Sequence, residues 1–406
     1  MKTFIFIESK PTEVSGIDYI RELGYSPILL TGLKYFKPNF HHEIDQSLFD
    51  FVYDIDTCNS QIIIDFLNKK EINVGAVLGC YDEVMITASE VALEFNLPHP
   101  NLKGLHNSFN KKNVRDILSL NGFPQPKYEV ISIGDSHKKI DTPYPFVLKP
   151  VRDAGANRVF LCKDEQSYQR AILDISESES ISYLGRKNEG FLIEQFLEGH
   201  FYGAELVYNQ GEWHVLGVNR IFVSPHDSLC MTGISHPSDL SEIQLQIACS
   251  NVLMWVNTLG LQGGALNVEF IYTSNGPVLV EINIRIAGAR AVEQILLTSG
   301  ISAVKTLINF ACGIEKEIVV EKEPTYNFVA DLFIFQNELG IVDDVLFKEK
   351  NNNLISFGFK KGMTTSNSKN KDFGKIIGYI LAKGENCAEA MSNAEEINKH
   401  LEIKYK

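Results

Sequence analysis

The chain has 406 residues, of which 44% are hydrophobic, so it is long enough to bury sizeable cores and to form two or three domains. Its formal net charge of −13 argues against a nucleic-acid partner and favours small-molecule chemistry. The seven cysteines are scattered and form no Cys-x-x-Cys pair, which argues for reduced thiols in a cytoplasmic protein. The apolar run at residues 4–7 ends at Glu8. It predicts a strand, because it is too short for a signal peptide or a membrane span.

Residues 1–104 form the first predicted unit, an α/β domain. Short apolar runs at residues 4–7, 27–30, 51–53 and 74–78 alternate with helical patterns at 14–23, 61–68 and 83–95. This rhythm predicts a parallel sheet covered by helices. Ligands of such sheets bind beyond the carboxyl ends of the strands, and Asp82 and Glu83 follow the last strand. Glu83 is therefore a candidate for binding an ammonium or guanidinium group; the alternative is that both acids only favour the helix dipole.

Residues 105–314 form the second predicted unit. Lys111 opens a helix, where a lysine opposes the helix dipole, so either an anion binds there or the residue lies on a solvated face. Lys149 ends a buried-looking strand and precedes the small-residue loop 152–157, a geometry that suits phosphate handling. Residues 315–406 form a third, small α+β unit, with strands predicted near 328–335, 354–359 and 376–382 and a helix at about 387–401.

Residues 264–290 carry the strongest pattern, two alternating runs that flank a turn and predict a β-hairpin with one apolar and one polar face. A three-residue loop at 274–276 sets Glu269 opposite Glu281 and Asn267 opposite Asn283, whereas a two-residue turn mixes the faces. Opposed like charges destabilise a sheet, so the pattern predicts a divalent cation between the carboxylates. Two Glu and an Asn suit Mg²⁺ shared with substrate phosphates. The alternative is a polar strand face in water.

Two arginines follow the hairpin. Arg285 lies two residues beyond Asn283, and Arg290 lies five residues further on. Cations beside Mg²⁺ are what a triphosphate needs, so both residues favour the metal-site interpretation. Arg290 is also a candidate for clamping a substrate carboxylate. His226, in the loop 224–227, is a candidate catalytic residue, with an ordinary loop histidine as the alternative.

Taken in order, these stretches resemble the ATP-grasp superfamily of carboxylate–amine ligases over essentially the whole chain. The resemblance implies an α/β ATP-grasp fold with an N-terminal parallel-sheet pre-ATP domain, a two-lobed grasp domain that holds ATP and Mg²⁺ between its lobes, and a small α+β C-terminal domain. Lys111, four residues before Arg115, and Lys149, in the run Pro-Phe-Val-Leu-Lys-Pro, match the two phosphate-binding lysines of the family. The hinge that meets adenine matches Glu194, Gln195, Phe196 and Leu197.

The same resemblance covers the hairpin. It implies that Glu269, Glu281 and Asn283 bind Mg²⁺, with Mn²⁺ as an alternative, that Asn267 helps to bind the nucleotide, and that Arg285 faces the phosphates. One position departs from the family pattern: Phe201 stands where many members carry Glu, and Glu205 is the nearby residue that can take over the ribose contact.

Within the superfamily, the run Val-Glu-Ile-Asn-Ile-Arg, the Asp-Glu after the fourth strand and the short tail are similar to bacterial L-amino-acid ligases. This implies that two unprotected amino acids are joined into a dipeptide through an acyl phosphate, with a homodimer as the assembly that the family favours. The residues leave the amino-acid pair open, a basic donor such as arginine included. The rival interpretations are a purine-pathway or carboxylase-like ligase, and a non-catalytic binding protein that kept the fold.

Overall fold

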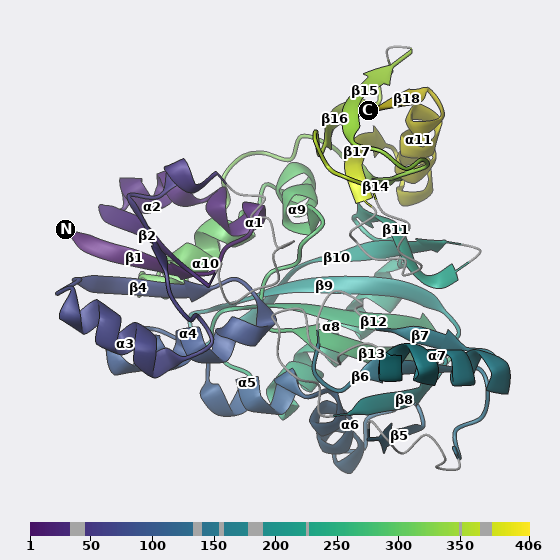
Figure 1. Cartoon of the computed structure of the whole chain (residues 1–406), viewed down its shortest axis with the longest axis horizontal. Helices are drawn as coiled ribbons and strands as arrows, with labels where there is room; N and C mark the ends of the chain where they lie inside the picture. The colour runs from purple at the N-terminus through teal and green to yellow at the C-terminus, as the bar shows by residue number, and fades with distance from the viewer. Residues whose placement is uncertain are drawn as a thin grey trace.

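The computed structural model describes residues 1–32, 45–132, 140–153, 158–177, 190–224, 227–348, 351–365 and 376–406. In Figure 1 an N-terminal sheet lies on the left, the long strands β9 (His200–Asn209) and β10 (Glu212–Ser224) cross the middle, and the C-terminal elements lie at the upper right. None of the helices in these ranges has both the length and the apolar character needed to cross a membrane.

Four parallel strands in the order β3-β2-β1-β4 form the N-terminal sheet, as the sequence predicts. Its elements are β1 (Lys2–Ile7), α1 (Pro11–Val14), α2 (Ile17–Glu22), β2 (Tyr25–Thr31), the short 3-10 helix η1 (Gln46–Leu48), β3 (Phe51–Asp54), α3 (Ser60–Lys69), β4 (Val74–Gly79) and α4 (Asp82–Glu94). The helix predicted over 14–23 is divided at Gly16. A Cβ there would lie 2.3 Å from Cδ1 of Ile308 in the later helix α10 (Ala303–Ala311), so the close packing of α10 requires glycine.

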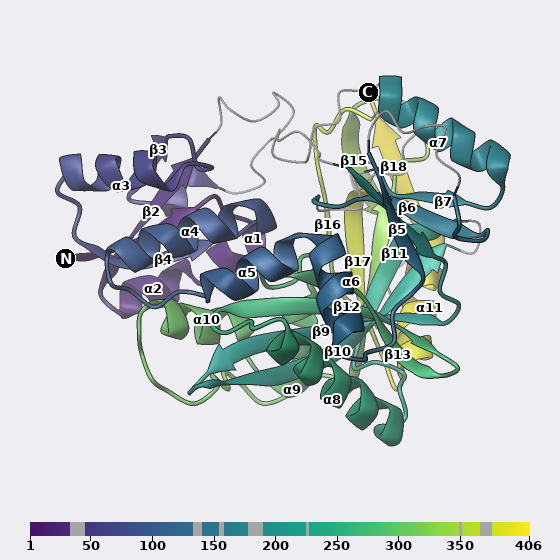
Figure 2. The ribbon, with the colours of Figure 1, turned by 90° about the horizontal axis from the view of Figure 1, so that it is seen from below.

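Helices α5 (Leu102–Phe109) and α6 (Lys111–Leu120) lead from the N-terminal sheet toward a small antiparallel sheet (Figure 2). The side chain of Asn110 accepts hydrogen bonds from the backbone N–H groups of Lys112 and Asn113, which fixes the start of α6 where the sequence predicts it. The small sheet has the strand order β5-β8-β6-β7 and packs against α7. Its elements are β5 (Tyr128–Ile131), β6 (Phe146–Pro150), β7 (Phe160–Cys162), α7 (Glu165–Glu177) and β8 (Phe191–Gln195).

The long sheet has eight strands in the order β13-β12-β9-β10-β11-β14-β17-β16. Its remaining strands are β11 (Asp227–His236), β12 (Ala265–Thr273), β13 (Gly276–Asn283), β14 (Phe328–Phe335), β16 (Leu354–Phe359) and β17 (Ile376–Gly384). The sequence assigns β14, β16 and β17 to a separate C-terminal unit, but β14 pairs with β11, so these strands extend the same sheet. The other helices are α8 (Glu242–Thr258), α9 (Ala291–Ser299) and α11 (Cys387–Lys399).

Two further strands escape the sequence pattern. Strands β15 (Val342–Phe347) and β18 (Leu401–Tyr405) pair with each other in a two-stranded sheet. Asp343 and Asp344 interrupt the apolar run of the first strand. The second strand does alternate apolar and charged residues, but it follows α11 directly, and the helix predicted at about 387–401 overlaps its first residue.

The hairpin of β12 and β13 has the predicted pairing at its polar positions. Glu269 pairs with Glu281, and Asn267 pairs with Asn283. The apolar residues between them, such as Val268, belong to the main hydrophobic core, which also includes residues of α6 and α8. The hairpin therefore presents one apolar and one polar face, as expected from the alternation.

The turn of this hairpin differs from the prediction. Thr273 pairs with Gly276, so the loop has two residues, 274 and 275, and the predicted three-residue loop is wrong. A β-bulge compensates for the difference, because Phe270 pairs with Leu279 and Val280 is left as an extra residue before Glu281. Leu279 takes the place in the core that the alternation assigns to Val280.

His236 ends β11 beneath α9. Its Nδ1 lies 2.6 Å from Oγ1 of Thr298 in α9, and the ring is only 5% exposed. Gly217 of β10 lies so close that a Cβ there would be 2.3 Å from Nε2 of His236. Burial lowers the pKa of His236 to about 4, so the imidazole is neutral in the folded protein at neutral pH.

This histidine makes stability depend on pH. Below its ordinary pKa of 6.5 the unfolded chain binds a proton that the folded chain binds only near pH 4, so the free energy of unfolding falls as the pH drops through that window. We expect His236→Gln to remove about 3 kcal/mol of this fall, measured by urea unfolding from neutral pH down to about pH 4. His214→Gln, at a partly exposed site on β10, is the matched control. An unchanged slope in His236→Gln would contradict the buried neutral imidazole.

Candidate functional site

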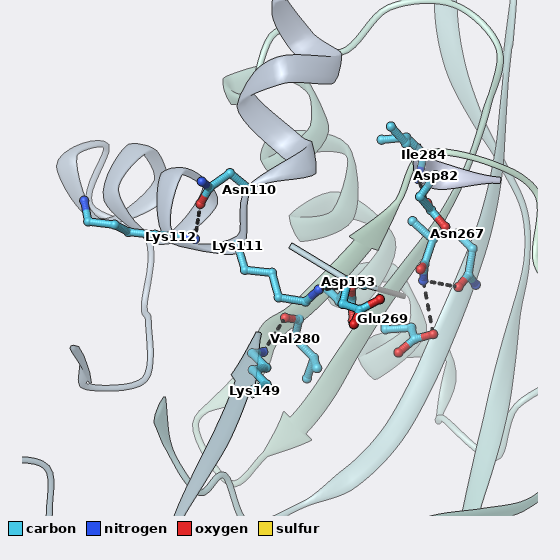
Figure 3. A network of polar contacts seen from close by, with 12 residues as sticks. Asp82, Asn110, Lys111, Lys112, Lys149, Asp153, Asn267, Glu269, Val280 and Ile284 are labelled. Atoms are coloured by element: carbon cyan, nitrogen blue, oxygen red, sulfur yellow. Dashed lines mark hydrogen bonds and ion pairs between the residues drawn. The ribbon is translucent and has the colours of Figure 1, made fainter. Parts of the chain in front are cut away.

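Glu269 and Glu281 face each other on the polar side of the hairpin. Burial, together with the charge of Glu281, raises the pKa of Glu269 to about 7. Lys111 is the first residue of α6, and its Nζ lies 2.7 Å from Oε1 of Glu281. The same Nζ donates to the backbone oxygen of Asp153 at 2.7 Å (Figure 3). Burial alone would lower the pKa of Lys111, but Glu281 raises it. The opposed carboxylates thus hold a buried cation of the protein beside them.

A row of amide and carboxyl groups continues from this pair across the sheet. Nδ2 of Asn283 donates to Oε1 of Glu269 at 3.2 Å and to Oδ1 of Asn267 at 3.0 Å. Nδ2 of Asn267 donates to Oε1 of Glu205 on β9 at 2.6 Å, and the backbone N–H of Ala287 donates to Oε2 of Glu205 at 3.1 Å. Burial raises the pKa of Glu205 to about 7. Glu205 therefore connects the hairpin to the loop that follows it.

Glu194 of β8 is the meeting point of two buried cations. Its Oε1 accepts from Nε of Arg115, and its Oε2 accepts from Nζ of Lys149, both at 2.6 Å. Burial alone would raise the pKa of Glu194, but the two cations lower it to about 2. The bulge carbonyl of Val280 accepts from Nη2 of Arg115 at 2.8 Å and lies 3.5 Å from Nζ of Lys149 (Figure 3). These contacts join the small sheet and α6 to the hairpin.

Arg285 is held by the N-terminal sheet. Its Nε donates to Oδ2 of Asp82 at 2.7 Å, and the backbone N–H of Ile284 donates to Oδ1 of Asp82 at 2.9 Å. Burial opposes the charge of Asp82, but Arg285 lowers the pKa of that carboxyl. The residue before α4, Tyr81, provides no side-chain cap. Asp82 therefore holds both the backbone just after β13 and the guanidinium of Arg285.

Two further ionisable groups lie near this pair. Burial, and then the charge of Arg285, lowers the pKa of Lys10 to about 8. Burial raises the pKa of Glu13 to about 7, against the opposing effect of Lys10. Lys10 also lies over the ring of Tyr81, 4.2 Å from its centre. The carboxyl edge of the parallel sheet thus carries several charged groups where it meets the hairpin. Ligands of such sheets bind at this edge, so charged groups are expected there.

The other predicted site residues take different places. Glu83 is buried in the first turn of α4, with 4% of its surface exposed. The hinge segment leaves β8 with Gln195 exposed, Leu197 partly buried and the N–H of Phe196 donating to the backbone of Pro145. His226 lies outside the described residues. The structure brings nine predicted residues together through hydrogen bonds, ion pairs and strand pairing: Lys111, Lys149, Glu194, Glu205, Asn267, Glu269, Glu281, Asn283 and Arg285.

Arg290 lies apart from that network, at the start of α9. Its Nη2 donates to Glu293 at 2.6 Å and to Oγ of Ser356 at 3.3 Å, and its guanidinium lies 3.7 Å from the centre of the Tyr379 ring. Arg290 therefore contacts β16 and β17, and no hydrogen bond or ion pair among the described residues joins it to the carboxylate pair.

Sequence reasoning does not predict the contacts of three groups that the site depends on: the side chains of Arg115 and Asp82 and the carbonyl of Val280. Arg115 had a detectable signal, since it lies on α6 between the buried residues Val114 and Leu118, where a charge needs a partner. Asp82 stood in the right place, but its partner is 203 positions away in the chain. Nothing in the sequence marks Val280, because the extra residue of a bulge can be an ordinary apolar residue of the strand.

Comparison with known proteins defines the class. Residues 142–293 match the sequence profile of the ATP-grasp domain, a range that includes Lys149, Glu194 and the whole hairpin. Residues 142–293 are therefore similar to an ATP-grasp domain, and the mixed α/β fold of the chain is the ATP-grasp fold.

Particular proteins resemble it over different lengths. The crystal structure of the L-amino acid ligase from Bacillus licheniformis has a TM-score of 0.81 and 18% identity, and the match covers 100% of this chain and 99% of that one. Phosphoribosylglycinamide synthetase from Anaerococcus prevotii has a TM-score of 0.72 and 16% identity, with 100% of both chains covered. Dapdiamide A synthase of Enterobacter agglomerans is 26% identical over 182 residues, which are 44% of this chain and 42% of that protein. The match thus spans less than half of dapdiamide A synthase.

The buried contacts of Glu194 can be tested by unfolding. We expect Glu194→Gln to lower the free energy of unfolding by about 3–5 kcal/mol, because Arg115 and Lys149 would stay buried without their counter-charge. The measurement is urea unfolding at neutral pH. Glu165→Gln, which removes an exposed carboxylate that accepts from Tyr144 and Gln169, should change stability little. Equal losses in the two variants would contradict this role for Glu194.

Proposed function

We propose that the protein is an ATP-dependent carboxylate–amine ligase that joins two amino acids into a dipeptide and releases ADP and phosphate. The observation that carries the proposal is the opposed pair Glu269 and Glu281 within an ATP-grasp domain, with Lys111 bonded to the pair. The likeness in fold to an L-amino acid ligase over the whole chain supports amino acids as the substrates.

The residues present suit Mg²⁺ and ATP. Two carboxylates and the amide oxygen of Asn283 are the hard oxygen ligands that Mg²⁺ or Mn²⁺ takes. Burial and, after it, the like charge of Glu281 raise the pKa of Glu269, and a divalent cation would offset that like charge. Glu269, Glu281 and Asn283 would hold the metal, which when bound supplies charge neutralisation at the triphosphate. The backbone of residues 194–197 remains for the adenine, since the side chain of Glu194 is already bonded to Arg115 and Lys149.

The proposed reaction has two steps. A carboxylate oxygen of the first amino acid attacks the γ-phosphorus of ATP, the bond to ADP breaks, and an acyl phosphate forms. The amine nitrogen of the second amino acid then attacks the acyl carbon, phosphate leaves, and the amine proton passes to solvent. Such transfers depend on position and charge rather than on a nucleophilic side chain. Lys149 and Arg285 provide that charge, and Asp82 keeps Arg285 in place.

The carboxylate-donating amino acid is assigned to the carboxyl edge of the N-terminal sheet. Glu83, buried at the start of α4, is proposed to bind its ammonium group. A desolvated charge that loses its partner costs several kcal/mol, so Glu83→Ala should raise the Michaelis constant of one amino acid far more than that of ATP. Equal effects on all substrates would return Glu83 to a role at the helix terminus.

The decisive experiment measures phosphate release with ATP and Mg²⁺ across all pairs of amino acids, with the products identified by mass spectrometry. Turnover that needs two amino acids and yields their dipeptide supports the proposal. The alternative is a ligase of another substrate class, which the likeness in fold to phosphoribosylglycinamide synthetase favours. Turnover with bicarbonate or with a phosphorylated sugar amine, and without a second amino acid, would establish that alternative.

The carboxylate pair gives a sharper prediction. Glu281→Gln should lower kcat by about 100- to 1000-fold, the usual loss when an electrostatic group of an active site is removed. The fold should persist, because Glu281 is partly exposed and the apolar face of the hairpin is untouched. Glu212→Gln, at an exposed position on β10, is the control and should leave kcat unchanged. Full activity of Glu281→Gln at ordinary Mg²⁺ concentration would contradict the metal assignment.

A further inference from the structure

Four polar residues gather beneath and at the start of α9: Asn219 of β10, Arg290, Gln294 of α9 and Asp331 of β14. We call this group the α9 seam. Asn219 is 2% exposed, Gln294 0% and Asp331 1%. Ile234 of β11 pairs with Asp331 of β14. The backbone carbonyl of Ile234 accepts a hydrogen bond from Nε2 of Gln294 at 3.3 Å, so the helix and the sheet are in direct contact here.

The α9 seam holds polar atoms that the described residues leave unbonded. They are both amide atoms of Asn219, Nε of Arg290, Oε1 of Gln294 and both carboxyl oxygens of Asp331. Native proteins leave only a few such buried atoms in each hundred residues. Their concentration in four neighbouring residues indicates that the α9 seam is built to bond with groups from outside the chain.

The strand register places the α9 seam on the face of the sheet that α9 covers. Ile221 of β10 pairs with Ile234, and Ile234 pairs with Asp331, so the three side chains share one face. Ile221 and Ile234 pack with Ala287 and Ala291 around the start of α9. Asn219, two residues before Ile221, lies on that face as well.

The same face carries the carboxylate pair. Asn219 pairs with Gly203 of β9, and Gly203 pairs with Glu269 of β12. Adjacent strands lie about 4.8 Å apart, so Asn219 is about 10 Å across the sheet from Glu269. The residue between them, Gly203, has no side chain of its own, and Nδ2 of Asn267 and Cδ1 of Ile221 lie next to it, 3.2 Å and 3.5 Å from the position that a Cβ would take. One end of the α9 seam is therefore within reach of a substrate bound at the carboxylate pair.

The unbonded atoms define the chemistry of the ligand. Acceptors prevail, with Oδ1 of Asn219, Oε1 of Gln294 and two carboxyl oxygens of Asp331, against the donors Nδ2 of Asn219 and Nε of Arg290. Burial raises the pKa of Asp331 to about 8, an effect that Arg290 opposes and Glu293 reinforces. A cationic nitrogen that binds there would restore the carboxylate. The guanidinium of Arg290 suits a carboxylate.

We propose that the α9 seam binds the amine-donating amino acid and selects one with a nitrogen-bearing, basic side chain. Asn219 accepts from the reacting amine, Arg290 pairs with the carboxylate, and Gln294 and Asp331 accept from the side chain. This inference rests on the proposed ligase function. It places the second substrate against α9 and β14, elements that follow Arg285 in the chain. The first substrate is assigned to the region of Asp82 and Glu83, so under this inference the two amino acids approach the phosphates from different sides.

Hydroxylamine separates the two half-reactions. Its nitrogen attacks the acyl carbon in place of the second amino acid, phosphate leaves, and a hydroxamate forms. In Asp331→Asn we expect the Michaelis constant of lysine, arginine or histidine as amine donor to rise about tenfold or more, the loss expected for a buried charge-assisted hydrogen bond. Hydroxamate formation should stay within about twofold of the wild type, because hydroxylamine makes none of these contacts.

Two further variants complete the experiment. Asn219→Leu removes both amide atoms, keeps the branched shape and the number of side-chain heavy atoms, and should give the same split between dipeptide and hydroxamate, which keeps the test open if Asp331→Asn does not fold. Asp343→Asn, at a partly exposed site on β15, makes the same chemical change outside the α9 seam and should leave both products unchanged. A melting curve of each variant confirms the fold.

The outcomes are distinct. A parallel loss of dipeptide and hydroxamate would show a structural role, and an unchanged Michaelis constant would show that ordered water satisfies the α9 seam; either result overturns the inference. If the wild type forms no hydroxamate with any amino acid, the proposed function fails instead. Equilibrium dialysis of lysine, arginine and histidine with the protein, ADP and Mg²⁺ then decides: binding that Asp331→Asn abolishes supports the α9 seam, and absent or unchanged binding overturns it.

Discussion

The opposition of Glu269 and Glu281 is the constraint on which the rest of the site depends. Two carboxylates that face each other across adjacent strands repel, and burial adds to the cost. The structure compensates with Nζ of Lys111 on one side and the amide of Asn283 on the other. Because Lys111 is the first residue of α6, this compensation also fixes where α6 lies against the hairpin. The cap that Asn110 gives to the helix thus acts on the site, since it sets the residue at which α6 begins.

A second set of buried charges ties the small sheet to the same place. Arg115 and Lys149 can remain buried only because Glu194 faces both of them and the carbonyl of Val280 takes a further donor. That carbonyl is available because the bulge removes Val280 from the regular pairing of the hairpin. One irregularity in a strand therefore serves two functions: it keeps the two glutamates opposite each other, and it offers an acceptor to the cations of the neighbouring sheet.

Arg285 stands between two chemically different regions. On one side Asp82 of the N-terminal sheet holds its guanidinium. On the other side the chain runs through residues 286–290 into α9, whose Gln294 is buried together with Asn219 and Asp331 of the sheet beneath it. Under the proposed function this asymmetry suits a reaction of two amino acids. Each substrate needs its own set of partners, while both must reach one activated phosphate, and the order of elements in the long sheet brings the C-terminal strand β14 into that arrangement.

Elements whose signal is local can be predicted from the amino-acid sequence. The parallel sheet, the start of α6 and the pairing of Glu269 with Glu281 follow from periodicity, a capping residue and the alternation of apolar and polar side chains, all of which act within a few neighbouring residues. It also singled out Lys111, Lys149 and Arg285, because a lysine in a first turn and an arginine beside a polar hairpin are chemically conspicuous.

The contacts between buried charges depend on how distant parts of the chain pack. Glu194 bonds with Arg115 across 79 positions of the chain, and Asp82 with Arg285 across 203, so no local pattern distinguishes these partners from other charged residues. The bulge at Val280 and the pairing of β14 with β11 are of the same kind. The physical reason is that a buried charge or an unpaired strand edge is satisfied by whatever group the packed fold brings to it, and that group is chosen by the packing of distant elements.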